Sequence, residues 1–229
     1  MHRLVARLAT PILALGLLAT PLAASALSED DAAGGLKEAL TRGAAKAVDV
    51  LGKPDGFFGN PKVKIPMPQK LARAEKAVRK FGGAKYADQL VETMNRAAET
   101  AVVEAKPILW AAIKQMTVKD AIGILRGPDD SATQYFRRTT SEPLTAKFKP
   151  VVESATAKVG VAKYYDKFAG RASKLGLVDA KDADLDSYIT EKALDGLFLM
   201  IADEERQIRK DPVATGNAII KKVFGSLFK

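Results

Sequence analysis

The side chains with the clearest catalytic potential are carboxylates near the C-terminal end of the chain. Asp195 follows Glu191 by four residues and precedes Asp203 by eight, so a helix would place all three on one side. An acid bordering an apolar segment can have a raised pKa and act as a general acid, which glycan-cleaving enzymes require. With Glu153 as a further acid, these residues suggest a carboxylate-dependent hydrolase or lyase of cell-wall glycan. The alternative is that Asp195 pairs with an arginine or a helix amide and holds the helices in register.

A second group of acids has partial calcium-binding spacing. Asp182, Asp184 and Asp186 match the first three oxygen ligands of a calcium loop. The match ends at Ser187, where the loop needs glycine, and at Ala193, where it needs a bidentate glutamate. Acids at a helix start also bind its free amides and favour its dipole. We therefore expect helix capping, with calcium as the alternative, and we expect no cofactor.

Composition excludes much other chemistry. The sequence has no Cys, and its one His is His2, in a segment that we expect to be removed. Pairs of Ser or Cys with His, zinc sites of thiolates and imidazoles, and disulfides therefore lack the residues that form them. There is also no phosphate-binding glycine loop.

The first 26 residues have the order of a secretory signal peptide. A basic start with Arg3 and Arg7 is followed by an apolar stretch and by the small residues Ala24-Ser25-Ala26. The apolar stretch is broken by prolines and is shorter than the roughly 20 residues of a membrane-spanning helix. We expect cleavage after Ala26 and export to the periplasm, with a retained anchor as the alternative. Residues 27–229 would then form one domain with no transmembrane segment.

Positive charge is concentrated in one part of that domain. The chain has 36 Lys and Arg against 27 acids, and the stretch from Lys62 to Lys85 holds eight of the bases and one acid, Glu75. Lysines that attract anionic headgroups, next to aromatics that enter the interface, are typical of a membrane-facing surface. The predicted binding residues are Phe57, Phe58, Lys62, Lys64, Lys70, Arg73, Lys76, Arg79 and Lys80.

A C-terminal helix could add to this surface through Lys221 and Lys222, opposite Phe224 and Phe228. The alternative is that the phenylalanines pack into the core and the lysines are only solvated. Nucleic acid is not expected as a partner, because an exported protein seldom meets it.

The elements that would position these residues are helices. Apolar side chains recur three or four residues apart, and no segment alternates as a strand does. A helix should begin after Ser28 and stop at Gly52, before an extended loop over residues 52–68. A basic helix with Leu71, Ala74, Val78 and Phe81 on one side should end at Gly82-Gly83.

Further signals divide the rest of the chain. Thr117 and Asp120 resemble a capping box, Asp130 or Ser131 caps one helix, and Ser141 caps another that Pro150 should kink. The longest helix should run from near Asp186 to about Lys210 as the central element, and Pro212 should start the last one. We predict an all-α, single compact multi-helix bundle of about eight to ten helices.

Three stretches are similar to a known family: LGKPDGFFGNPKVKIPMP at 51–68, AIKQMTVKDAIGILRGPDDSATQYFRRTTSEPL at 112–144 and DLDSYITEKALDGLFLMIADEERQIRKDP at 184–212. They resemble the bacterial family catalogued as domain of unknown function 4197. The resemblance implies a helical protein of the bacterial envelope and carries over no catalytic residue. Our leading hypothesis is a non-enzymatic envelope protein that binds lipid, a membrane surface or another protein through its basic face. The oligomeric state is not predicted.

Overall fold

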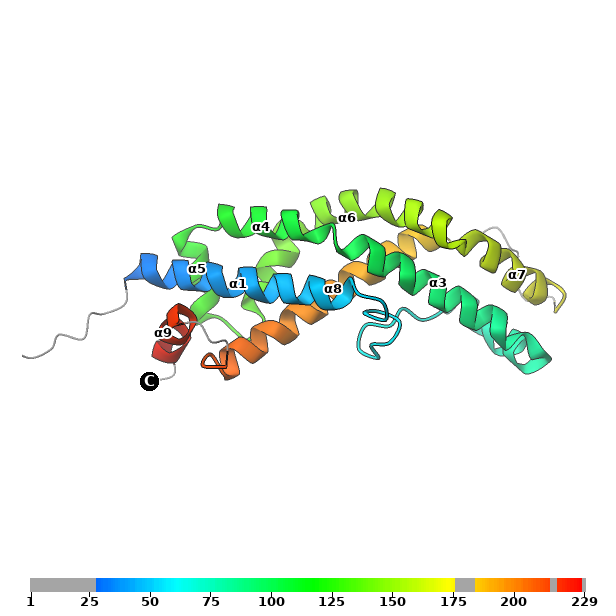
Figure 1. Ribbon diagram of the computed structural model, residues 1–229, viewed down its shortest axis with the longest axis horizontal. Helices are drawn as coiled ribbons and strands as arrows, with labels where there is room; N and C mark the ends of the chain where they lie inside the picture. The colour runs from blue at the N-terminus through cyan, green and yellow to red at the C-terminus, as the bar shows by residue number, and fades with distance from the viewer. Residues whose placement is uncertain (1–27, 176–183, 215–217, 228–229) are drawn as a thin grey trace, which may run out of the picture.

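The computed structural model describes residues 28–175, 184–214 and 218–227, and the predicted signal peptide lies outside them. The described residues form nine α-helices and no strand, which confirms the all-α prediction (Figure 1). The helices are α1 (Glu29–Leu51), α2 (Ala72–Val78), α3 (Ala84–Val102), α4 (Ala105–Gln115), α5 (Val118–Arg126), α6 (Ser131–Val159), α7 (Val161–Ser173), α8 (Leu185–Lys210) and α9 (Ala218–Leu227). None of the helices described is both long and apolar enough to cross a bilayer.

Several predicted helix ends are confirmed, and each of them is set by hydrogen bonds between residues close together in the sequence. The Ser28 side chain accepts a hydrogen bond from the Asp31 amide, and α1 stops at Gly52. Thr117 and Asp120 form the predicted reciprocal capping box at the start of α5. These bonds join residues no more than four positions apart, so the sequence alone contains the information.

The bundle is elongated, and α8 runs obliquely along it (Figure 1). α8 packs against α1, α3 and α6, with Ile189, Ala193, Leu197 and Ile201 buried. The helix is not enclosed on all sides, however, because Leu199 is 39% exposed. α8 thus packs against three helices, as expected of a central element, but one of its sides faces outward.

The longest helix is α6, with 29 residues, because Ser141 does not begin a new helix. The hydroxyls of Thr140, Ser141 and Thr145 each donate to the backbone carbonyl four residues earlier. These bonds keep the hydroxyls within a continuous helix rather than at its start. The helix continues through Pro143 and Pro150.

The helix expected after Asp130 begins where predicted but is capped differently, and the predicted start of the last helix is wrong. Asp130 occupies the N-cap position of α6 but makes no capping hydrogen bond, because Glu205 of α8 binds the amides of Ala132 and Thr133 instead. The described part of α9 starts at Ala218, and Pro212, the predicted start, lies in a turn over residues 211–214 in which the Ala214 amide donates to Asp211.

Candidate functional site

The predicted basic face divides into two parts, and the loop part is occupied by contacts within the protein. Lys62 Nζ lies 2.6 Å from Asp203 Oδ2, and Lys64 Nζ lies 4.0 Å from the centre of the Phe58 ring. Phe57 is fully buried, so its predicted place on a binding surface is wrong. Phe58 is partly buried against the core. Phe57 therefore packs inward, as the alternative interpretation has it, and Phe58 does so only in part.

Side chains of α3 hold this loop, residues 52–68, in place. Glu99 Oε1 accepts hydrogen bonds from the amides of Phe57 and Phe58, each at 3.1 Å. The Asn95 side chain accepts a hydrogen bond from the Ile65 amide at 2.8 Å and donates one to the Ile65 carbonyl at 2.9 Å. It thus satisfies both backbone groups of Ile65, as a paired β-strand does. Because both side chains are buried, they satisfy backbone groups that water does not reach.

The helical part of the basic face remains exposed. Leu71, Ala74 and Val78 are spaced three and four residues apart and point into the core. The basic residues between and beside them face outward, and these are Lys70, Arg73, Lys76, Arg79 and Lys80. Of this set only Arg79 is paired with described acids, since it binds both Glu75 and Asp88.

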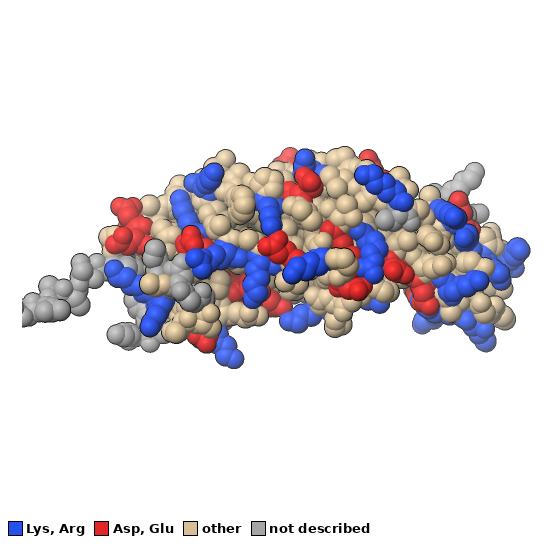
Figure 2. Space-filling view, in the orientation of Figure 1, with Lys and Arg blue, Asp and Glu red and all other residues tan. Residues whose placement is uncertain are grey.

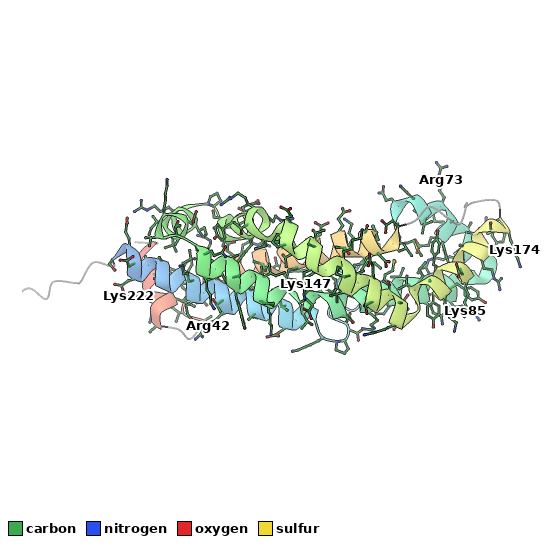
Figure 3. The ribbon with its side chains drawn as sticks, turned by 90° about the horizontal axis from the view of Figure 1, so that it is seen from above. Arg42, Arg73, Lys85, Lys147, Lys174 and Lys222 are labelled. Carbon is green, nitrogen blue, oxygen red and sulfur yellow. The ribbon has the colours of Figure 1, made fainter. Side chains whose placement is uncertain are left out.

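A second helix adds basic residues that we did not predict. α7 packs against α2 and α3, and it brings Lys167, Arg171 and, just after its end, Lys174 to the same end of the bundle. Figure 2 shows Lys and Arg gathered at this end, whereas acids and bases are intermixed over the rest of the visible face. In Figure 3, Arg73, Lys85 and Lys174 all lie at this end of the bundle, with Arg73 and Lys85 on opposite sides of it, far from Arg42 and Lys222.

We define the basic end as Lys70, Arg73, Lys76, Lys80, Lys85, Lys167, Arg171 and Lys174. None of these eight side chains forms an ion pair with another described residue. The α7 contribution has a sequence signal, because Lys163, Lys167, Arg171 and Lys174 follow one another at four, four and three residues. That spacing gives one basic helical face.

Phe81 lies exposed within the basic end. The prediction placed it with Val78 on the buried side of a helix, but its side chain is 64% exposed. The reason is the turn between α2 and α3, where Gly82 has a left-handed φ of 78° and Phe81 itself leaves helical geometry. Lys80 Nζ lies 5.9 Å from the centre of its ring. An apolar ring is thus presented among cations.

A hollow of about 450 Å³ lies between α3 and α7 inside the basic end. Arg171 Nη2 donates to the Tyr86 hydroxyl at 3.5 Å, and Lys85 Nζ lies 5.1 Å from the Tyr86 ring. The Arg171 hydrogen bond, and then the positive charge of Lys85, lower the pKa of Tyr86. The lining residues are Lys85, Tyr86, Gln89, Asp166, Lys167, Gly170, Arg171 and Lys174.

The three carboxylates proposed for catalysis are not brought together. Glu191 and Asp195 line a hollow of about 380 Å³ between α6 and α8, whereas Glu153 lines a different one beside α7. Asp195 is 50% exposed and lies 3.0 Å from Lys192 Nζ and 3.9 Å from Arg137 Nη1. An arginine does lie near Asp195, but the pairing is at the surface rather than inside the bundle, and Lys192 is the closer partner. The hydrolase hypothesis gains no support.

The acids with calcium-like spacing serve other purposes where they are described. Asp184 accepts a hydrogen bond from the Ser187 amide at 2.9 Å and so caps α8, as expected. Asp186 accepts from the Thr156 hydroxyl at 2.8 Å. Asp182 lies outside the described residues. Within the described part of the chain, no three metal-ligating side chains converge.

A family model described as "Protein of unknown function (DUF4197)" matches residues 26–225. No curated protein and no solved structure matches the chain.

Proposed function

We infer the function of this chain, which belongs to the DUF4197 family of proteins of unknown function, from the charge of its basic end. We propose a non-enzymatic protein of the cell envelope that binds anionic membrane surfaces through this end. The observation that carries the proposal is the group of eight cations without described ion-pair partners at the end of the bundle that also carries the exposed Phe81 ring.

The energetics favour binding to an anionic surface. Lys and Arg near an anionic bilayer contribute about 1 kcal/mol each, and the contribution falls off within a Debye length of roughly 8 Å at physiological salt. Because the eight cations lie at one end of an elongated bundle, many of them can reach the same surface together (Figure 2). An exposed aromatic ring such as that of Phe81 can enter the interface between headgroups and acyl chains.

Export is part of the same proposal. A signal peptide over residues 1–26 would deliver the protein to a compartment bounded by membranes, where lipid headgroups are abundant anions and nucleic acid is rare. Mass spectrometry of the protein from fractionated cells tests this step. A periplasmic product that starts at residue 27 supports it, and an uncleaved cytosolic product contradicts it.

Vesicle flotation tests the binding. The purified protein is mixed at low salt with vesicles of phosphatidylglycerol in phosphatidylcholine, and with vesicles of phosphatidylcholine alone. We expect binding to the anionic vesicles only, weakening as salt is raised. Replacing Lys70, Arg73, Lys76 and Lys80 with Gln should lower the partition coefficient roughly 10²- to 10³-fold, at about 1 kcal/mol per cation.

A matched control removes the same charge elsewhere. Lys114, Lys119, Arg126 and Lys210 are also exposed and without described ion pairs, but they belong to α4, α5 and the far end of α8. Their replacement with Gln should change vesicle binding little. If both quadruple variants lose binding equally, only net charge matters and the basic end has no special role. If the unaltered protein binds no anionic vesicle, membrane binding is wrong.

A further inference from the structure

We propose that the hollow between α3 and α7 is a binding site for a phosphomonoester group, the doubly charged phosphate that a lipid headgroup or a soluble metabolite can carry. This inference deepens the proposed membrane binding and rests on it. It assigns recognition of a phosphomonoester to one part of the basic end, whereas the rest of that end attracts any negatively charged surface.

The lining supplies the donors that a phosphate needs. Lys85, Lys167, Arg171 and Lys174 converge on the hollow from two helices, and Asp166 is the only acid among the lining residues that the structure describes. Arg171 presents a planar set of donors that suits phosphate oxygens, of which the described structure uses one for the Tyr86 hydroxyl. The lysines add charge without strict geometry.

The start of α3 gives an independent electrostatic argument. The positive end of the α3 dipole lies at Ala84, where no acidic residue occurs in the first turn and no side chain caps the helix. Lys85 nevertheless stands in that first turn, which places a cation where an anion is favoured. A bound phosphate would relieve this repulsion as well as the mutual repulsion of the four basic side chains.

The dimensions fit a phosphate attached to a larger molecule. A volume of about 450 Å³ lies within the range of small-molecule sites, roughly 300–1,000 Å³. The Tyr86 ring, flanked by Lys85 and Arg171, forms one wall. A phosphodiester carries one negative charge, whereas a phosphomonoester approaches two at neutral pH, so the site should prefer the monoester.

The test compares vesicles of equal surface charge that contain phosphatidic acid, a phosphomonoester, or phosphatidylglycerol, a phosphodiester. We expect the full chain to bind phosphatidic acid vesicles about tenfold more tightly. Replacing Lys167, Arg171 and Lys174 with Gln should abolish that preference while binding to phosphatidylglycerol persists. The matched replacement of Lys70, Arg73 and Lys76 should weaken both lipids by a similar factor and leave the preference intact.

A second arm separates the two sources of phosphate. Calorimetric titration with glycerol 3-phosphate detects a soluble ligand, and a signal that the α7 variant loses supports the site with that source. Phosphatidic acid preference without a calorimetric signal supports a lipid source. Two results overturn the inference. One is equal binding to both lipids with no response to glycerol 3-phosphate. The other is a preference for phosphatidic acid that persists when Lys167, Arg171 and Lys174 are replaced. Either result leaves the proposed membrane binding intact. Membrane binding itself is contradicted only if the unaltered protein binds no anionic vesicle.

Discussion

Glu205 and Arg209 form a buried ion pair one turn apart on α8, and each also binds the end of another helix. Their side chains meet at 2.9 Å. Glu205 accepts from the amides of Ala132 and Thr133 at the start of α6, and Arg209 donates to the Ile124 carbonyl near the end of α5. An anion thus lies at a helix N-terminus and a cation at a C-terminus, as the helix dipoles favour. The pair fixes α5 and α6 against α8.

Replacing Glu205 with Ala should lower the free energy of unfolding by about 3–5 kcal/mol, because it leaves the buried Arg209 charge and two amides unpaired. Urea denaturation followed by circular dichroism measures the change. The exposed Glu191, on the same helix, is the control, and its replacement with Ala should change stability by less than about 0.5 kcal/mol. A loss below about 1 kcal/mol for the Glu205 variant would show that the pair is not structurally important.

Replacing Asn95 with Ala should lower the free energy of unfolding by about 1–3 kcal/mol, because it leaves the Ile65 amide and carbonyl buried without their partner. Hydrogen exchange measured by mass spectrometry should show faster exchange within residues 52–68. Thr100 is an exposed residue of the same helix, and its replacement with Ala should leave the exchange unchanged. Unaltered protection of the loop in the Asn95 variant would contradict the anchoring role.

Gly196 allows the loop to approach α8 closely, so its replacement with Ala should destabilise the protein by about 1–3 kcal/mol. An added Cβ would lie 2.7 Å from Phe57 Cε1 and 3.3 Å from Val63 Cβ. Gly123 of α5 is the control, since no side chain or neighbouring element lies within 4 Å of its Cβ position. Its replacement with Ala should stabilise the helix by roughly 0.5–1 kcal/mol. Thermal melts that rank the two variants the other way round would exclude this close packing.

Replacing Phe81 with Ala should weaken binding to anionic vesicles roughly tenfold and leave the unfolding temperature nearly unchanged, because the ring is exposed in the free protein. Flotation at fixed salt measures the first quantity. Trp110 of α4 provides a matched control, as an aromatic residue that is 44% exposed away from the basic end. Equal losses for the Phe81 and Trp110 variants would mean that Phe81 has no special contact with the membrane.

The ion pair between Lys62 and Asp203 predicts a pH dependence of stability. The Lys62 hydrogen bond, assisted by Arg206, holds the pKa of Asp203 below its usual value of 3.8. A carboxylate with a lowered pKa in the folded state stabilises the protein above pH 3.8, and this contribution is lost as the pH falls through the folded-state value. The stability difference between the unaltered protein and its Asp203→Asn variant should therefore be constant from pH 5 to 7 and shrink below about pH 3.8. A difference that does not change with pH would rule out the ionised pair.

The sequence by itself determined the helical class and those helix ends that depend on neighbouring residues. Ser28, the Thr117–Asp120 pair and Gly82 act within one turn of the chain, through a capping bond or a left-handed φ. It also located the basic stretch that begins at Lys62, because charge can be counted without knowing the fold. Such local effects need no distant partner.

Only the tertiary structure decided which of those residues form a surface. Phe57 is buried because Gly196, 139 positions later, leaves room for its ring, and Phe81 is exposed because the chain turns beside it. The basic end exists because α7 packs beside α2 and α3. Burial and electrostatic fields depend on distances in space, and residues far apart in the chain are brought to those distances only when the helices pack.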